Sequence, residues 1–433
     1  MIEKKSHYDV AVIGDWHLAF VTAACLADSG HRTLLVNPFT SWPEFPTCPV
    51  QEPGLAEMIS RTRAAGNFDF ANGVSTDWSA DAIWLAVDTP VSENDKPNVG
   101  PLVEISQQVR AKSLQPRVFA VSSQVPIGFC AGLNALFEGK VAYIPENLRL
   151  GQGIATFAKA DRTVIGGATD ETSQYVQNLL KNFQTSFILC DLPTAEMVKH
   201  ANNAFLATSI SFANEMARIG SHFGVDSYKV AQALKLDSRI GTKAYVAPGL
   251  GFAGGTLPRD LRVLEALGQQ NKIPTPLVSA VLEVNRSTSD LVAEIALKNL
   301  PQGKERRVLI LGYTYKADTD TLRRSLSIDI AKSLQARGVE CHGYDPVMNS
   351  MDLAVLEGVI EHHSNLESIP TCPLVLLMTA RPAFAELSWS KLKKPSGDST
   401  LVVDTQGFLR PERIHEAGLR YRLMWSPESR SKN

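Results

Sequence analysis

Residues 8–14 read Tyr-Asp-Val-Ala-Val-Ile-Gly, and this stretch decides the fold. An apolar run that ends at a glycine is typical of a buried strand, and residues 18–29 behind it carry a helical pattern that Gly30 ends. A second apolar run covers residues 33–36. Strand, helix and strand together predict one βαβ unit, whose two strands lie parallel in a sheet with a right-handed crossover.

The same alternation continues on both sides of a long helical segment. Residues 195–223 contain no proline and no glycine before Gly220, which predicts one long helix with Thr194 as its N-cap and Gly224 beyond its end. Shorter helices are predicted at residues 227–236, 276–300 and 327–337. Further strands are predicted at residues 82–87, 118–121, 142–144, 162–165, 308–311, 340–344, 373–378 and 401–403.

These patterns predict an α/β fold class, with two Rossmann-like doubly wound domains joined by a long central helix and a helical middle domain. The predicted boundaries give a first Rossmann-like domain at residues 1–193, a central helical domain at residues 194–300, and a second Rossmann-like domain at residues 301–433.

The composition narrows the function classes. Of 433 residues, 44% are hydrophobic and 20% charged, and the formal net charge of −2 gives no reason to expect nucleic acid or a membrane surface as a partner. The six cysteines are scattered and form no C-x-x-C pair, which argues against a zinc site or disulfides and favours a cytoplasmic location. The pair His362-His363 is interpreted as part of a loop, because no carboxylate and cysteine cluster accompanies it; no metal is therefore predicted.

The most specific feature is a glycine-rich loop. Residues 249–255 hold four glycines, and residues 251–260 read Gly-Phe-Ala-Gly-Gly-Thr-Leu-Pro-Arg-Asp. Such a density of glycine suits a place where the backbone must approach a ligand closely. The loop resembles the active-site loop of the UDP-glucose and GDP-mannose dehydrogenases, in which Gly-Phe/Tyr-Gly-Gly-Ser-Cys-Phe-Pro-Lys-Asp is the usual pattern.

The resemblance covers nearly the whole chain. Matching segments occur at residues 52–55, 88–90, 125–128, 145–149, 196–205, 237–241 and 316–323. It implies a nucleotide-sugar 6-dehydrogenase, in which NAD oxidises the C6 alcohol of a UDP-hexose twice and a cysteine thiolate holds the intermediate as a thiohemiacetal and then a thioester. It also implies a UDP-binding C-terminal domain, a homodimer paired through the central helix, and a role in polysaccharide biosynthesis.

At the catalytic positions the match is incomplete. Thr256 stands where the family has its cysteine, and a threonine hydroxyl is a far weaker nucleophile, so the covalent half of the mechanism is predicted to be absent. Lys199 and Asn203 lie four residues apart on one helix face, and by resemblance would stabilise charge on the reacting oxygen. Asp260 would hold or deprotonate a water, and Glu146 is retained. Without the family match, Lys199 would be interpreted as a solvated surface lysine.

The cofactor site departs from the family too. Its G-x-G-x-x-G motif corresponds here to Gly14, Trp16 and Ala19, and Asp15 adds a carboxylate where a diphosphate would bind. The acid expected on the ribose is Asn37. Trp16 is interpreted either as a packed core aromatic or as a residue that stacks on a ligand. NAD is implied by resemblance, with weak or lost binding predicted. The predicted cofactor-binding residues are Gly14, Trp16, Asn37, Thr89, Gln124, Arg259 and Arg323.

The nucleotide-sugar side keeps more of its residues. By resemblance, the predicted substrate-binding residues are Arg239, Tyr245, Gly249, Gly251, Phe252 and Lys316. The arginine that the family has after the strand at residues 401–403 is replaced by Gln406, which puts that contact in doubt. Two lone histidines, His17 and His200, are interpreted as structural.

Three functional hypotheses remain open at this point. The chain is an oxidoreductase that performs at most one hydride transfer, a catalytically inactive nucleotide-sugar-binding homologue that serves as a regulator or partner subunit, or an enzyme with an altered reaction in the same pocket. Retained Lys199, Asn203 and Asp260 favour the first hypothesis. The lost cysteine, glycines and ribose acid favour the second.

Overall fold

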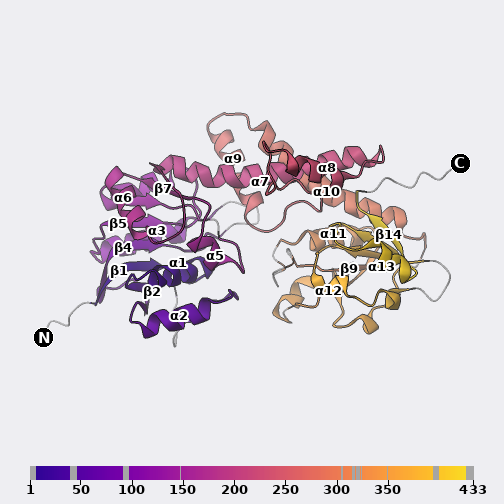
Figure 1. Ribbon diagram of the computed structural model, residues 1–433, viewed down its shortest axis with the longest axis horizontal. Helices are drawn as coiled ribbons and strands as arrows, with labels where there is room; N and C mark the ends of the chain where they lie inside the picture. Colours follow the sequence, from indigo (N-terminus) through magenta and orange to yellow (C-terminus); the bar gives the residue numbers. More distant parts are fainter. Residues whose placement is uncertain are drawn as a thin grey trace. The chain divides into compact units, whose positions relative to one another are not determined.

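The computed structural model describes residues 6–39, 46–90, 97–146, 148–303, 306–314, 317, 322, 324–348, 350–393 and 399–425. The chain forms two compact units, Met1–Asn202 and Asn203–Asn433 (Figure 1). The division falls within the long helix α7 (Leu192–Ser221), so its first turns belong to the first unit and the rest to the second.

The first unit is built on one twisted sheet of order β3-β2-β1-β4-β5-β6-β7-β8. Neighbouring strands are parallel except for β6 and β7, which pair antiparallel. The first six places follow the Rossmann order, which confirms the predicted fold class for this unit. The strands are β1 (Ser6–Ile13), β2 (Thr33–Asn37), β3 (Phe68–Asn72), β4 (Trp78–Leu85), β5 (Val118–Val121), β6 (Val141–Tyr143), β7 (Thr163–Gly167) and β8 (Phe187–Asp191).

Both faces of this sheet are buried, as parallel sheets require. Along β1, Val10 and Val12 belong to one hydrophobic cluster, and Ala11 and Ile13 belong to the other. The first cluster includes residues of α1, α2 and α6, and the second includes residues of α3 and α4. The helices are α1 (His17–Asp28), α2 (Leu55–Ala64), α3 (Gly100–Ala111), α4 (Phe129–Phe137), α5 (Gly153–Ala158) and α6 (Asp170–Leu179).

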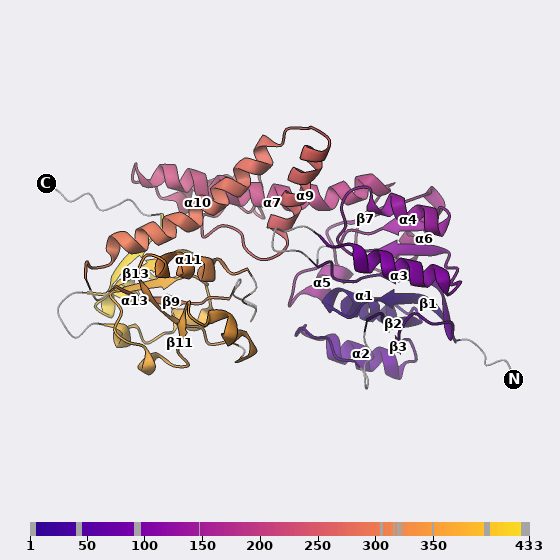
Figure 2. The ribbon, with the colours of Figure 1, turned by 180° about the vertical axis from the view of Figure 1, so that it is seen from behind.

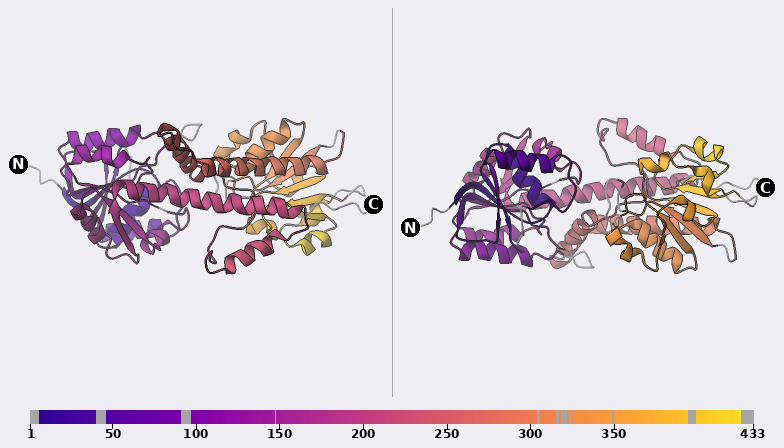
Figure 3. Two further views of the ribbon diagram at one scale, coloured as in Figure 1. Left: turned by 90° about the horizontal axis from the view of Figure 1, so that it is seen from above. Right: turned by 90° about the horizontal axis from the view of Figure 1, so that it is seen from below.

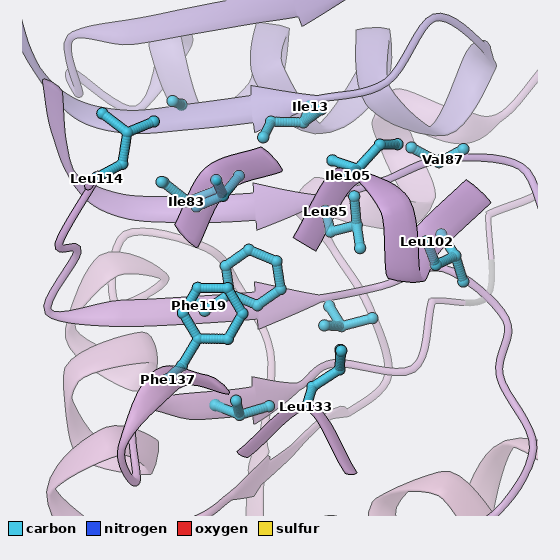
Figure 4. Packing of buried hydrophobic residues seen from close by; sticks show 14 of the residues in the cluster. Ile13, Ile83, Leu85, Val87, Leu102, Ile105, Leu114, Phe119, Leu133 and Phe137 are labelled. Carbon is cyan, nitrogen blue, oxygen red and sulfur yellow. The ribbon is translucent and has the colours of Figure 1, made fainter. Parts of the chain in front are cut away.

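Aromatic packing joins the sheet to α4. Phe119 of β5 and Phe137 at the end of α4 stack with ring centroids 3.9 Å apart and planes inclined by 9°. Figure 4 shows these two rings face to face below Ile83 and Leu85 of β4. Stacked aromatic pairs of this kind bury large apolar areas and fix a helix against a strand.

The second unit carries a second parallel sheet, of order β11-β10-β9-β12-β13-β14. This again is the Rossmann order, with β9 in the central place, and hydrophobic clusters cover both of its faces. The strands are β9 (Arg307–Leu311), β10 (Glu340–Tyr344), β11 (Glu361–His362), β12 (Leu374–Leu377), β13 (Leu401–Asp404) and β14 (Arg420–Leu423).

Helices of the second unit include one that the sequence did not predict. Residues Leu257–Gln270 form α9, so the predicted loop through residue 260 ends at Thr256. Pro258 at the second helical position suits a helix start, because its missing N–H has no partner there anyway. The other helices are α8 (Ser227–Leu236), α10 (Pro276–Asn299), α11 (Leu326–Gln335), α12 (Pro382–Ala385) and α13 (Pro411–Glu416), with 3₁₀ helices at Ser350–Leu356, Leu366–Ser368 and Trp389–Leu392.

Helix α10 packs beside the part of α7 that belongs to the second unit (Figures 2 and 3). Ala207 of α7 and Val281 of α10 share one hydrophobic cluster with Phe252 and Leu261. The Ser211 hydroxyl donates to the carbonyl of Val281 at 3.1 Å. Among the described residues, no helix is long and apolar enough to cross a membrane.

The predicted N-cap of α7 is wrong. The helix starts at Leu192, two residues before Thr194. The backbone N–H of Thr194 donates to the Asp191 carboxylate at 2.8 Å, so Asp191 supplies the capping oxygen. Pro193, in the first turn, has no N–H to satisfy.

A buried carboxylate attaches α7 to α4. Glu196, with no exposed surface, accepts backbone N–H bonds from Gly128 at 2.6 Å and from Cys130 at 2.8 Å. These donors lie at the N-terminus of α4, where free N–H groups and the helix dipole favour an anion. Burial, together with the charge of Glu196, raises the pKa of the Cys130 thiol well above its ordinary value.

We predict that Glu196→Gln lowers the free energy of unfolding of the first unit by about 1–3 kcal/mol, because the new NH₂ group must face a backbone donor and leaves it unpaired. Urea denaturation measures the change. Glu215→Gln, an exposed position on the same helix, is the matched control and should change stability by less than about 0.5 kcal/mol. Equal losses in the two variants would contradict the assigned role of Glu196.

Candidate functional site

Four predicted cofactor residues gather at one edge of the first sheet. Gly14 follows β1, Asn37 ends β2, Thr89 comes after β4 and Gln124 comes after β5. These strands are neighbours and run parallel, so their carboxyl ends meet at the same edge. In open α/β sheets, ligands bind outside the carboxyl ends of the strands.

Gly14 is required by the packing at this edge. A Cβ at Gly14 would collide with the carbonyl oxygen of Ala86 and would lie 2.7 Å from the Cβ of Ala19. Its N–H donates to the carbonyl of Val36 at 2.9 Å. Gly14 therefore lets α1, with Ala19 in its first turn, start close against the end of β4.

The interpretation of Trp16 as a packed core aromatic is wrong. Its side chain is 44% exposed, because Trp16 has an extended backbone just before α1 and lies outside the helix body. The side chain of Trp16, the N-cap residue, makes no capping hydrogen bond, and the N-terminus of a helix suits an anion. Half-buried Asp15 opposes such an anion. Burial raises the pKa of its carboxyl, and the charge of Asp88 raises it further.

Two polar side chains at this edge are engaged within the protein. The side-chain oxygen of Asn37 accepts the N–H of Phe39 at 3.0 Å, and Asn37 is fully buried. The hydroxyl of Thr89 donates to the carbonyl of Gln124 at 2.7 Å. These bonds shape the loops that follow β2, β4 and β5.

Lys199 is a buried residue, which excludes the surface interpretation. Only 5% of it is exposed, and its ammonium donates to the main-chain carbonyl of Glu146. The same nitrogen lies 3.6 Å from the Glu146 carboxylate, which also accepts the N–H of Leu148 at 2.6 Å. The first unit thus holds a lysine and a glutamate, both predicted to be catalytic, in direct contact.

His17 and His200 have structural contacts, as the sequence suggested. The Nε2 of His17 lies 2.7 Å from the Glu52 carboxylate, which also accepts backbone N–H groups of Gly151 and Gly153. The Nε2 of His200 lies 3.0 Å from the carbonyl of Val125. Both imidazoles are buried, and each one ties a helix to a loop.

In the second unit, Asn203 and Asp260 are in contact. The Asn203 amide donates to the Asp260 carboxylate, which is completely buried on the first turn of α9. Thr256 immediately precedes α9, and its exposed side chain caps no backbone N–H. Arg259 is buried on the same turn as Asp260. The N-terminus of α9 therefore presents Thr256 to solvent one turn before a buried carboxylate.

Two asparagines hold the glycine-rich loop. The side chain of Asn214 on α7 accepts the N–H of Gly249 at 2.8 Å. Asn285 on α10 brackets Phe252, accepting its N–H at 2.8 Å and donating to its carbonyl at 3.0 Å. Gly251 has φ +101°, and a Cβ there would collide with the Asn285 side chain. The tight fit explains why a glycine stands at Gly251.

The remaining predicted substrate residues are not all brought together. Gln406 lies beside Gly249, and its amide donates to the carbonyl of Met378 at 3.0 Å. Arg239 is exposed and pairs with Asp237 at 2.6 Å, and Tyr245 is 48% exposed. Lys316 and Arg323 lie outside the described residues.

A separate hollow of about 890 Å³ lies along α2 and the segment before it. None of the residues predicted to bind the cofactor or to take part in catalysis lines it. The lining residues are Pro46, Thr47, Cys48, Val50, Gln51, Glu52, Pro53, Gly54, Leu55, Ala56, Glu57, Ile59, Ser60, Arg63 and Ala64.

Comparison with known proteins matches this arrangement to one family along almost the whole chain. Three domains of the UDP-glucose/GDP-mannose dehydrogenase family match in order: the NAD binding domain at residues 8–184, the central domain at residues 193–287 and the UDP binding domain at residues 309–411. The chain belongs to the UDP-glucose/GDP-mannose dehydrogenase family.

Individual members of the family resemble the chain over most of its length. UDP-glucose 6-dehydrogenase TuaD of Bacillus subtilis is 28% identical over 97% of this chain and 94% of its own. UDP-glucose 6-dehydrogenase of Rhizobium meliloti is 28% identical over 97% of this chain and 100% of its own. The solved UDP-glucose dehydrogenase of Pyrobaculum islandicum superposes with a TM-score of 0.83, at 27% identity, over 98% of this chain and 99% of that one.

The six cysteines of this family member are free thiols, four of them buried and two, Cys48 and Cys190, partly exposed. Burial raises the pKa of the Cys25 and Cys341 thiols to about 12 and raises the pKa values of Cys48 and Cys190 as well. A raised pKa disfavours the thiolate, which is the nucleophilic form. Cys372, also buried, lies 3.3 Å from the carbonyl of Pro370.

The sequence reasoning missed Asn285 and Glu196 as positioning residues. Asn285 sits mid-helix on α10, where a single asparagine carries no signal until the loop it holds is known. Glu196 was noticed only as part of a matched segment. The four glycines at residues 249–255 were the one signal in the sequence that another group must approach this backbone closely.

We predict that Asn285→Ala speeds amide hydrogen exchange across residues 249–255 by roughly tenfold or more, because two bonds to Phe252 worth about 1 kcal/mol each are lost. Exchange measured by mass spectrometry reads this directly. Asn299→Ala is the matched control, because the side chain of Asn299 on the same helix bonds only to its own helix, at the Ile295 carbonyl. If the rate of amide hydrogen exchange in residues 249–255 is unchanged in Asn285→Ala, then Asn285 does not hold the loop.

Proposed function

We propose that this chain binds a UDP-hexose and performs at most one hydride transfer, from the C6 alcohol to NAD. The observation that carries the proposal is the N-terminus of α9. Thr256 stands there, in the family's cysteine position, with an exposed hydroxyl, while Asp260 one turn later is buried and in contact with Asn203. The chain thus has the residues proposed for acid–base catalysis, but it lacks a cysteine for the covalent step.

The electron balance shows why this matters. Oxidation of the alcohol to an aldehyde releases one hydride and one proton, and NAD, when bound, accepts the hydride. Conversion of the aldehyde to a carboxylate removes a second hydride, which a second NAD accepts, and adds an oxygen from water; in this family the second hydride leaves from a thiohemiacetal. A neutral threonine hydroxyl forms such an adduct poorly, so the chemistry stops after the first step.

The chain's own polar groups fit the first step. Lys199 and Asn203 are one helical turn apart in the sequence of α7, and each is buried in its own unit. In a site with little water, such groups stabilise the charge that develops on the C6 oxygen. Glu146, in contact with Lys199, fixes the position of the ammonium.

A second candidate is a nucleotide-sugar-binding homologue without catalysis. The carboxyl end of β1 favours it, because the carboxylate of Asp15 lies where a diphosphate would bind. Burial raises the pKa of that carboxyl, so its charge is lost more readily as the pH falls. The acceptor oxygen of Asn37 is already used by Phe39. The N-terminus of α1 still fits a diphosphate, so NAD binding is expected to be weak and to improve as the pH falls and Asp15 loses its charge.

We predict that the wild-type chain, given NAD and UDP-glucose, forms no uronate. Thr256→Cys is expected to yield two NADH per sugar, because a thiolate at the N-terminus of α9 restores the thiohemiacetal between the enzyme and the aldehyde. Absorbance at the NADH band and mass spectrometry of the sugar are the measurements. Thr256→Ser is the matched control, with a hydroxyl in place of the thiol.

Calorimetric titration of the wild-type chain with UDP-glucose and NAD separates the two candidates. Binding of both ligands, with one NADH formed per sugar and an aldehyde as the product, supports the oxidoreductase. Binding of UDP-glucose alone, with no gain in Thr256→Cys, supports the inactive homologue. Uronate formed by the wild-type chain would falsify the proposal that the missing cysteine limits the reaction.

We further propose a three-domain division at residues 1–193, 194–300 and 301–433, a cytoplasmic location, a role in polysaccharide biosynthesis and a homodimer. The family matches at residues 193–287 and 309–411 support the division. A stripe of exposed apolar side chains on and just after α7 supports the dimer. Successive members of the stripe are seven, four, three and four residues apart, as on one face of a helix that pairs with another. Its members are Phe205, Phe212, Met216, Ile219 and Phe223.

We predict that the double variant Phe212→Glu/Ile219→Glu is monomeric, because two charges then face the stripe of a second copy. Light scattering coupled to size-exclusion chromatography gives the mass. Phe39→Glu, at an exposed phenylalanine of the first unit, is the control and should stay dimeric. A wild-type chain that is monomeric at micromolar concentration would overturn the dimer.

A further inference from the structure

Two tripeptides of the form Glu-x-His lie side by side at the edge of the second sheet. Residues 340–342 belong to β10, and residues 361–363 begin with β11. The strands are parallel with His342 opposite Glu361, and the N–H of His363 continues the pairing by donating to Gly343 at 2.9 Å. Side chains alternate along a strand, so Glu340, His342, Glu361 and His363 share one face of the sheet.

Three of these side chains converge. The Nδ1 of His342 lies 3.1 Å from the Nε2 of His363 and 3.3 Å from a carboxylate oxygen of Glu361. The Nε2 of His363 lies 3.9 Å from the other oxygen of Glu361. Both histidines are buried, while Glu361 is exposed. His362 belongs to β11, so the interpretation of the His362-His363 pair as part of a loop is wrong for His362.

The hydrogen bonds of the two imidazoles are incomplete in this arrangement. Among the described residues, the buried Nε2 of His342 has no hydrogen-bond partner, and a carboxylate oxygen of Glu340 lies 3.5 Å from it. The Nδ1 of His363 lies 3.3 Å from the hydroxyl of Ser368. The two facing nitrogens can share only one proton. A cation between them would accept both lone pairs and leave each far nitrogen protonated toward an oxygen.

We propose that His342 Nδ1, His363 Nε2 and the Glu361 carboxylate bind a divalent transition-metal ion of the Zn²⁺ class. At Zn–N and Zn–O distances of about 2.1 Å, tetrahedral ligand atoms lie roughly 3.4 Å apart, close to the observed spacings. Two neutral imidazoles and one carboxylate suit zinc, whereas Ca²⁺ and Mg²⁺ prefer oxygen ligands only. The exposed side of Glu361 leaves a fourth position to water.

Glu340 and Ser368 act as positioning residues in this site. They accept the far N–H groups of the two bound histidines, the pattern that fixes the tautomer of a metal-bound imidazole. His362 points to the other face of β11, where Tyr313 contacts its Nδ1, so it does not ligate. The ion would join β10 to the two-residue edge strand β11, independently of the proposed dehydrogenase chemistry.

The test uses the full chain, freed of any histidine tag and stripped with a chelator. Titration with ZnCl₂ alone is expected to show one ion per chain and to raise Tm by several degrees. His342→Ala and His363→Ala should each weaken binding by about 100-fold or more, and Glu340→Gln or Ser368→Ala by about tenfold. Co²⁺ in place of Zn²⁺ should give the visible absorption of a four-coordinate site.

The matched control is His362→Gln, which removes the neighbouring imidazole on the opposite face and should keep full affinity. Circular dichroism confirms that each variant is folded. The proposal is overturned if the wild-type chain binds no more Zn²⁺ than the His342→Ala/His363→Ala double variant. It is equally overturned if His362→Gln loses as much affinity as either ligand variant.

Discussion

The buried carboxylate of Glu196 sets the position of the first turns of α7, and much of the candidate chemistry follows from that position. It accepts two N–H groups at the start of α4, and four residues later His200 contacts the carbonyl of Val125 in the same loop. Two contacts one turn apart fix both the depth and the rotation of the helix. Lys199, between them, is thereby placed against Glu146 in the interior.

The glycine-rich loop depends on an analogous constraint within the second unit. Its backbone is held by the side chains of Asn214 and Asn285, which come from two packed helices. Because Gly251 adopts a positive φ and touches Asn285 closely, the loop can take this path only without a Cβ there. The path ends at Thr256, where α9 begins and directs Asp260 into the interior.

The candidate site residues and the residues that pack the fold differ in their surroundings. Thr256 is exposed just before α9. Trp16 is exposed, and Asn37 has found a backbone partner in Phe39. Positions with steric demands, such as Gly14, are kept. Different contacts thus set the fold and the candidate site, and a fold does not by itself fix the reaction that it hosts.

The sequence by itself determined both doubly wound sheets, because buried strands and helices leave local patterns of period two and 3.6, and the bounds of α8 and β10 agreed with prediction. The family resemblance added the candidate site residues. Tertiary structure alone decided the edge strands β3, β11 and β14, the start of α7, the burial of Lys199, and the convergence of His342, Glu361 and His363. These features depend on partners distant in the chain, so no local pattern could reveal them.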